Sequence, residues 1–199
     1  MQEDSITELV CTRISHDVIG NIGAVANAVE LLEEGDMDFI DDIRSILKVS
    51  SKVLTSRLKF FRMAFGLSNS NLNDINIVEE TAKAYLQTIG NASYPIMLDL
   101  ELHTTIYTRV ALLVVMILAD VLIKGGRIEV REVDSRLVAI IHSDFPASEE
   151  KIKNIKNILQ GNAFEKQAQY APVVYLQNIL NNVKKINMIE ENTFGLIIG

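Results

Sequence analysis

The segment RISHDVIGNIGA (residues 13–24) places His16 next to Asp17 and follows this pair with Gly20 and Gly23. Histidine is neutral over part of the physiological pH range, so one ring nitrogen can act as a nucleophile and accept a phosphoryl group. The adjacent carboxylate can accept a hydrogen bond from the other ring nitrogen, although an acidic residue here is equally typical of an ordinary solvent-facing position. The residue types therefore predict nucleophilic chemistry at His16, with Asp17 in a weaker orienting or acid–base role.

The residues around this pair predict a long amphipathic helix, because apolar residues recur at spacings of three and four. They are Val10, Ile14, Val18, Ile22, Val25, Val29 and Leu32. At about 100° per residue, His16 lies about 160° from both Ile14 and Val18, so its ring is expected to face away from the core. An exposed histidine on a helix is most often only a surface residue, and that interpretation stays open.

The two glycines are unusual in a helix, where each costs about 1 kcal/mol relative to alanine. They can clear space beside His16 for the backbone of another protein. Glycine pairs also mark close packing between helices, and both interpretations stay open. The predicted partner-contacting residues are Thr12, Arg13, Ile19, Gly20, Gly23, Arg57 and Arg62.

The segment between residues 42 and 74 is basic. No acidic residue lies between these limits, and the cations are Arg44, Lys48, Lys52, Arg57, Lys59 and Arg62. In an antiparallel hairpin that turns near residue 36, the level of His16 matches that of about residue 56. The last three cations are therefore expected close to the histidine, with Arg13 on its own helix. This positive field suits an anionic group or an acidic partner, and a solvated basic face that balances the acidic hairpin tip is an equally good interpretation.

The pattern along the chain predicts an α+β fold in two parts, residues 1–68 and 72–199, joined by the polar linker LSNSNLND. The first part is expected to be a helical hairpin over residues 5–67, which has no third element to cover its outer apolar edges. We therefore expect two copies to form a dimeric four-helix bundle. The elements expected in the second part are a strand at 75–78, a helix at 79–89, a strand at 95–102, a helix at 105–124, two strands over 127–144 joined by a turn at Asp134 and Ser135, helices near 148–159 and 169–184, and strands at 186–189 and 193–198.

The bulk composition bounds the function classes. The 199 residues carry a net charge of −7, which argues against nonspecific binding to nucleic acid or to an anionic membrane. Cys11 is the single cysteine, so neither a disulfide framework nor a thiolate zinc site is expected. The longest apolar run, residues 110–123, contains Asp120 and is too short to span a bilayer. The start of the chain is acidic and unlike a signal peptide, so a cytoplasmic location is expected.

One stretch of the first predicted helix resembles a known family. The segment SHDVIGNIGAVANAVELLEEG (residues 15–35) resembles the H-box helix of histidine kinases and, more closely, the first helix of the bacterial ChpT family of histidine phosphotransferases. The matching positions are Ser15-His16-Asp17, Gly23-Ala24 and Asn27-Ala28-Val29-Glu30-Leu31-Leu32. Asn21 departs from the pattern, since kinases and many phosphotransferases have proline there.

The resemblance implies that the second part is a degenerate histidine-kinase ATPase-like α/β sandwich. Active kinases hold ATP and Mg²⁺ with an asparagine motif, an Asp-x-Gly-x-Gly sequence and a glycine-rich lid. The corresponding helix here offers Asp120 and Lys124 but no asparagine, and FPASEEK after the next strand has no glycine pair. Without these loops we expect no cradle for a triphosphate, no cofactor and no autophosphorylation from ATP. Asp120 is interpreted as a relic of the nucleotide site or as a satisfied interior carboxylate.

For function, the resemblance implies a phosphorelay intermediate. His16 would accept a phosphoryl group from the receiver domain of a hybrid histidine kinase and pass it to the aspartate of a CtrA-type response regulator of the bacterial cell cycle. The receiver would supply Mg²⁺ and most of the transition-state stabilisation, while this chain positions the imidazole in line. The alternative is a non-catalytic dimeric scaffold that binds receiver domains.

Overall fold

The structure, a computed structural model, describes six stretches of the chain. They are residues 3–35, 39–67, 70–162, 164–180, 185–190 and 193–199. The predicted boundary at residue 68 lies outside these stretches. No helix within them is long and apolar enough to cross a membrane.

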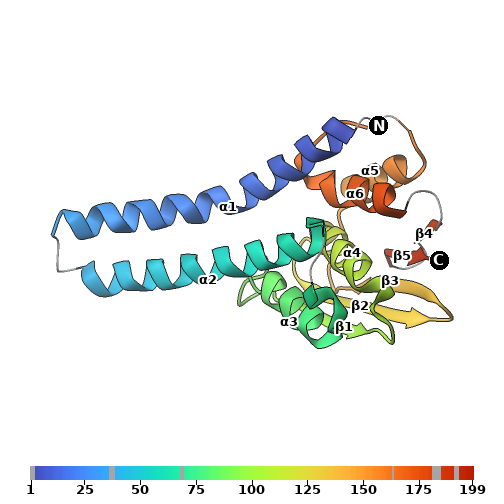
Figure 1. Cartoon of the computed structure of the whole chain (residues 1–199), viewed down its shortest axis with the longest axis horizontal. Coiled ribbons are helices and arrows are strands. Elements are labelled where there is room, and N and C mark those ends of the chain that lie inside the picture. Colours follow the sequence, from blue (N-terminus) through green and yellow to red (C-terminus); the bar gives the residue numbers. More distant parts are fainter. Residues whose placement is uncertain (1–2, 36–38, 68–69, 163, 181–184, 191–192) are drawn as a thin grey trace.

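Two long helices form the hairpin that the sequence predicts. Helix α1 (Glu3–Glu33) and helix α2 (Ile40–Phe65) run side by side, with one end against the rest of the molecule and the other projecting away from it (Figure 1). Gly35 follows α1 with a φ of 76°, the left-handed conformation that commonly ends a helix. Asp41 and Asp42 lie in the first turn of α2, where negative charge is favourable.

A five-stranded mixed sheet forms the second part. Its strands are β1 (Ile96–Glu101), β2 (Gly126–Val133), β3 (Arg136–His142), β4 (Ile186–Ile189) and β5 (Gly195–Ile198), in the order β1-β2-β3-β5-β4. Strands β1 and β2 are parallel, and the other neighbours are antiparallel. Asp134 and Ser135 join β2 to β3 with φ values of 49° and 60°, as a tight hairpin turn requires. The predicted turn is therefore confirmed.

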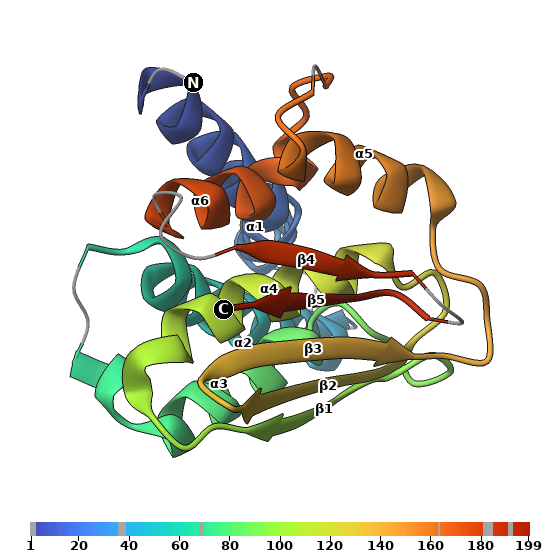
Figure 2. The same cartoon turned by 90° about the vertical axis from the view of Figure 1, so that its right-hand side faces the viewer.

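Four helices lie with this sheet: α3 (Ile75–Leu86), α4 (Thr108–Val121), α5 (Glu149–Leu159) and α6 (Ala171–Leu180). Short 3₁₀ turns η2 (Ser70–Asn73), η3 (Thr105–Tyr107) and η4 (Ala168–Tyr170) precede α3, α4 and α6. Figure 2 shows the helices on one side of the sheet. The α+β class is thus confirmed, and the predicted helix at 169–184 is described only to Leu180.

One predicted strand is wrong. Residues 75–78 form the first turn of α3 because Asp74 caps it: the carboxylate accepts hydrogen bonds from the backbone N–H of Asn76 at 2.9 Å and of Ile77 at 3.3 Å. A capping aspartate satisfies amide groups that are otherwise unpaired at a helix start, so helix begins where the apolar run suggests strand.

Helix α4 is the centre of the core. It packs against α2, α3, α5, α6 and the sheet, and every one of its residues except Arg109 and Asp120 is buried. The core is continuous with the base of the hairpin, where Ile6, Leu9 and Phe60 are buried. The predicted apolar stripe of α1 is therefore covered only near the base. Toward the tip its members lie exposed in the single chain: Ile22, Val29 and Leu32.

Candidate functional site

His16 lies on the outer face of α1, where the hairpin leaves the rest of the molecule. Its side chain is 82% exposed, which confirms the prediction that the ring faces solvent. Gly20 and Gly23 are also exposed, and a methyl group at either would meet no atom within 4 Å. The surface beside the imidazole is therefore open, and no packing contact among the described residues requires the two glycines.

Asp17 links the exposed ring to buried groups. Its Oδ1 lies 3.4 Å from Nδ1 of His16, and its Oδ2 accepts a hydrogen bond of 2.8 Å from Nε of Arg13. The Asp17 side chain is 16% exposed, so one oxygen faces the solvent-exposed ring and the other faces inward. This arrangement suits a carboxylate that orients an imidazole and fixes its tautomer.

The expectation that Arg13 is an accessible partner contact is wrong. The residue is only 7% exposed because η4 and α6 pack against this part of α1. Its Nη1 and Nη2 donate to the two carboxylate oxygens of Asp120 at 2.8 and 3.0 Å, in a bidentate pair. Nη1 also lies 3.4 Å from the carbonyl oxygen of Gln169. The guanidinium is therefore fully engaged inside the protein.

Asp120 lies on α4. The structure favours its interpretation as a satisfied interior carboxylate over that as a relic of a nucleotide site. Besides its pair with Arg13, its backbone carbonyl accepts a hydrogen bond of 2.6 Å from Nζ of Lys151. Burial raises the pKa of the Asp120 carboxyl, although Arg13 and Lys151 oppose this effect. Burial also disfavours the charge of Arg13, but Asp120 outweighs it and the pKa of the guanidinium lies above its ordinary value.

Of the predicted cations on α2, Arg57 is the one that the structure brings to the site. Its Nη1 donates to the backbone carbonyl of Asp17. Its Nε and Nη2 donate to the hydroxyl and carbonyl oxygens of Thr88 at 3.1 and 3.0 Å. This contact confirms the prediction that the part of α2 near residue 56 lies at the same height along the hairpin as His16. Arg62 is exposed on the same helix, and on α1 the exposed candidates are Thr12 and Ile19.

The space between α4, α5 and α6 is nearly filled. The described residues leave a cavity of about 10 Å³ beside Asp120, Lys151 and Tyr170. That is about the space of one water molecule. It is far smaller than the several hundred Å³ of a typical ligand pocket.

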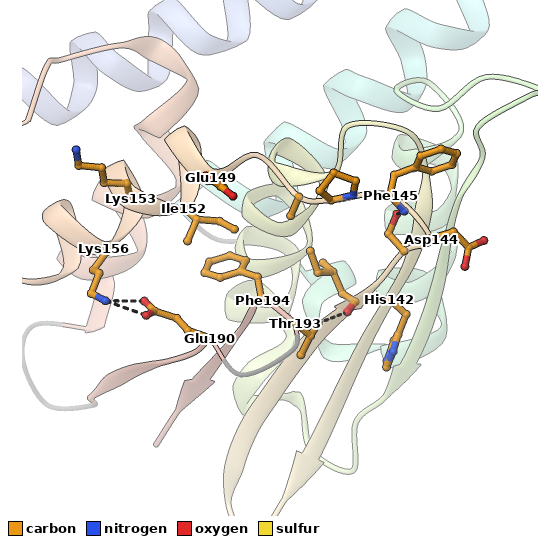
Figure 3. Close-up of a pocket in the computed structure, with 14 residues that line it drawn as sticks. His142, Asp144, Phe145, Glu149, Ile152, Lys153, Lys156, Glu190, Thr193 and Phe194 are labelled. Carbon is orange, nitrogen blue, oxygen red and sulfur yellow. Dashed lines mark hydrogen bonds and ion pairs between the residues drawn. The ribbon is translucent and has the colours of Figure 1, made fainter.

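A larger cavity, of about 750 Å³, lies on the other side of α5 (Figure 3). Its apolar lining includes Ile141, Ile152 and Phe194. Lys156 is paired with Glu190 at 2.8 and 2.9 Å, and the side chains of Lys153 and Asp144 point outward. A phosphate site requires charged groups that converge on one point. The charged groups of this cavity do not converge in this way. Within the described residues, no group of three or more His, Cys, Asp or Glu side chains is placed to hold a metal ion.

Comparison with known proteins shows similarity both in sequence and in structure. Protein phosphotransferase ChpT of Brucella abortus (strain 2308) is 45% identical over 62 residues, which are 31% of this chain and 29% of that protein. The chain thus matches less than a third of the length of this curated relative. A solved structure described as a bacterial phosphotransferase superimposes with a TM-score of 0.79, covering 100% of this chain and 98% of the other at 23% identity. No protein-family model matches.

The chain is ChpT-like. This confirms the resemblance that residues 15–35 carry in the sequence. The similar structure shows the fold over the full length of the chain. Sequence reasoning predicted the exposed His16, the adjacent Asp17 and the nearby Arg57, which the structure brings together. It missed the Arg13–Asp120 pair, whose members lie 107 positions apart. The available signal was an aspartate in an otherwise apolar helix.

Proposed function

We propose that this chain is a histidine phosphotransferase of a two-component phosphorelay, with His16 as the phosphoacceptor. The proposal rests on one observation above all: an exposed imidazole held beside Asp17 on a surface that two glycines leave open. The ChpT-like sequence and fold support phosphoryl transfer as the reaction. His16 would accept the group from the receiver domain of a hybrid histidine kinase and pass it to the aspartate of a CtrA-type response regulator.

The chemistry at His16 follows from its contact with Asp17. A hydrogen bond from Nδ1–H to Oδ1 of Asp17 leaves the lone pair on Nε2, which points to solvent. Nε2 attacks the phosphorus of the receiver's aspartyl phosphate, the N–P bond forms, and the O–P bond breaks with its electron pair on the carboxylate. The ring then carries a positive charge that Asp17 stabilises. Transfer to the second receiver reverses these steps, and the Mg²⁺ of both reactions is expected from the receiver domains.

A second copy of the chain is the proposed partner of the hairpin tip. Apolar side chains are exposed there on both helices: Ile22, Val29, Leu32, Ile46 and Val49. A four-helix bundle of two hairpins would cover them. The α/β part would be a degenerate ATPase-like domain beside this bundle, a wall against which a receiver docks. The proposal includes a cytoplasmic location and no nucleic-acid partner, in keeping with the net charge of −7.

The proposal excludes ATP as the direct phosphoryl donor. The filled space between α4, α5 and α6 and the scattered charges of the larger cavity support this exclusion. Incubation of the protein with radiolabelled ATP and Mg²⁺ is expected to leave it unlabelled. Labelled histidine under these conditions would show that the α/β part retains kinase activity.

The decisive experiment is transfer from a phosphorylated receiver. A hybrid-kinase receiver from the same organism, labelled with ³²P on its aspartate, is mixed with the wild type and with His16→Ala. Label is expected on the wild type and not on the variant. The matched control replaces the two other histidines, His103 and His142, which are exposed near the sheet, and is expected to accept label normally. If the receiver binds but no label transfers to the wild type, the chain is instead a scaffold.

A further inference from the structure

The Arg13–Asp120 pair lies in the interior next to the candidate site, and the transfer chemistry described above does not use it. Arg13 donates through three nitrogens, to Asp17 at 2.8 Å and to Asp120 at 2.8 and 3.0 Å. A charged pair of this kind adds little stability, because desolvation offsets the attraction and apolar residues of similar volume often serve as well or better. Stability therefore does not explain why this charged pair lies inside the protein.

Asp17 divides its two oxygens between this pair and the histidine. Oδ2 is held by Nε of Arg13, and Oδ1 faces Nδ1 of His16 at 3.4 Å. The planar guanidinium fork fixes the orientation of the carboxylate, since rotation of Asp17 would break the contact at Oδ2. Arg57 holds the same residue from the other helix through its backbone carbonyl. The side chain and the main chain of Asp17 are thus both restrained.

Asp120 in turn fixes the guanidinium. Its two oxygens take both terminal nitrogens of Arg13, and Lys151 from α5 donates to its backbone carbonyl. A continuous series of contacts therefore runs from α5 and α4 through Arg13 and Asp17 to the exposed ring. The series connects the α/β part of the molecule to the imidazole on the hairpin.

We propose that Arg13 and Asp120 are positioning residues that hold Asp17 so that His16 keeps its proton on Nδ1 and its lone pair on Nε2. This inference rests on the proposed function, because it assigns a role in the same transfer reaction. Without the pair, Asp17 rotates freely and both ring tautomers become populated. The fraction of rings with a nucleophilic Nε2 in the required orientation then falls, and a misplacement of about 1 Å can slow a reaction about 100-fold.

The test replaces the pair by apolar residues, in the double variant Arg13→Met/Asp120→Leu, which removes the guanidinium together with the Asp120 carboxylate that would otherwise lose its partner. Transfer from the ³²P-labelled receiver is measured as a function of receiver concentration. We expect kcat to fall about 100-fold with KM unchanged. Lys153→Met, which removes an exposed cation from α5, is the matched control and is expected to behave as the wild type.

The tautomer of His16 is measured independently by ¹⁵N NMR of its ring nitrogens at a pH where the ring is neutral. The wild type is expected to show Nδ1–H, and the double variant a mixture of both forms. A wild-type tautomer pattern in the double variant overturns the proposal, whatever its rate. Should that variant fail to fold, Arg13→Lys takes its place, because an ammonium group does not bridge both carboxylates. Absence of label on the wild type would refute the proposed function, while the NMR result would still decide the positioning role.

Discussion

The base and the tip of the hairpin are built from the same two helices but are covered differently. At the base, Leu9 and Phe60 are buried against the α/β part. At the tip, Val29 and Val49 are equally apolar and yet exposed, Val49 by 58%. The periodic apolar pattern is continuous from one end to the other. The difference shows that the pattern specifies which side of a helix must be covered, and it supports the proposal that a second copy covers the tip.

His16 lies at the border between these two regions. The residues just before it are held by the body of the protein, through Arg13, whereas Ile19 just after it is exposed. A phosphoacceptor needs a rigid support on one side and room for a partner on the other. The border offers both, which agrees with the role proposed for His16.

The largest effect is expected from truncation at the covered base. Phe60 is fully buried and stacks on Tyr85 at 3.9 Å, so Phe60→Ala is expected to lower the free energy of unfolding by about 3–5 kcal/mol. Leu58, two residues earlier on α2, is 51% exposed, and Leu58→Ala is expected to cost less than about 1 kcal/mol. Urea unfolding of both variants checks the contrast. Similar losses from the two substitutions would contradict the described base.

The second prediction concerns the uncovered tip. Val49→Glu places a charge in the proposed interface between two copies, and symmetry introduces it twice. We expect the dissociation constant of the dimer to rise at least about 100-fold, since the two buried valines together contribute about 3–6 kcal/mol. Analytical ultracentrifugation measures the change. Ser51→Glu, on the opposite side of α2, is the control. A monomeric wild type, or a dimer unaffected by Val49→Glu, would remove the second copy from the proposal.

The covered and uncovered regions also differ in how far the sequence predicts them. Local patterns gave the helical hairpin, the turn at Asp134 and Ser135, and the exposure of His16, because each depends on neighbours within a few residues. The strand predicted at residues 75–78 is wrong because the Asp74 carboxylate caps a helix there, and the apolar run alone does not indicate this. Arg13 was misplaced since its burial depends on η4 and α6, which lie far along the chain. Periodicity within one helix carries no information about such a remote contact.

The third prediction tests the open surface beside His16. A methyl group at Gly20 meets no neighbouring atom, so Gly20→Ala is expected to raise the free energy of unfolding by about 1 kcal/mol. Gly20→Leu is expected to slow phosphoryl transfer about tenfold, because its side chain occupies the space of the partner. Ala26→Leu, at an exposed position further along α1, controls for added bulk. Normal transfer by Gly20→Leu would show that no partner approaches this surface.

A second uncovered surface differs from the tip, because ion pairs lie there among exposed apolar side chains such as Met97 and Val133. The face of the sheet opposite the helices exposes ion pairs, with Arg131 bonded to Glu129 at 2.5 Å and to Glu101 at 2.9 Å. Charged side chains of this kind are well solvated and need no partner to cover them.

The smallest effect is expected at Glu132, near the end of β2. Partial burial disfavours the charge of Glu132, but hydrogen bonds from the Thr104 hydroxyl and from the backbone N–H groups of His103 and Thr104, each 2.8 Å, outweigh it and lower its pKa. A lowered carboxyl pKa stabilises the fold above the ordinary value of about 4.3, and this contribution is lost as the pH falls through the folded-state pKa.

Glu132→Gln is accordingly expected to lower the free energy of unfolding by at most about 1 kcal/mol at pH 7 and to have little effect near pH 3. Urea unfolding at both pH values measures the difference, with Glu80→Gln at an exposed position of α3 as the control. If Glu132→Gln lowers the free energy of unfolding equally at both pH values, the charge of the Glu132 carboxylate does not contribute to stability.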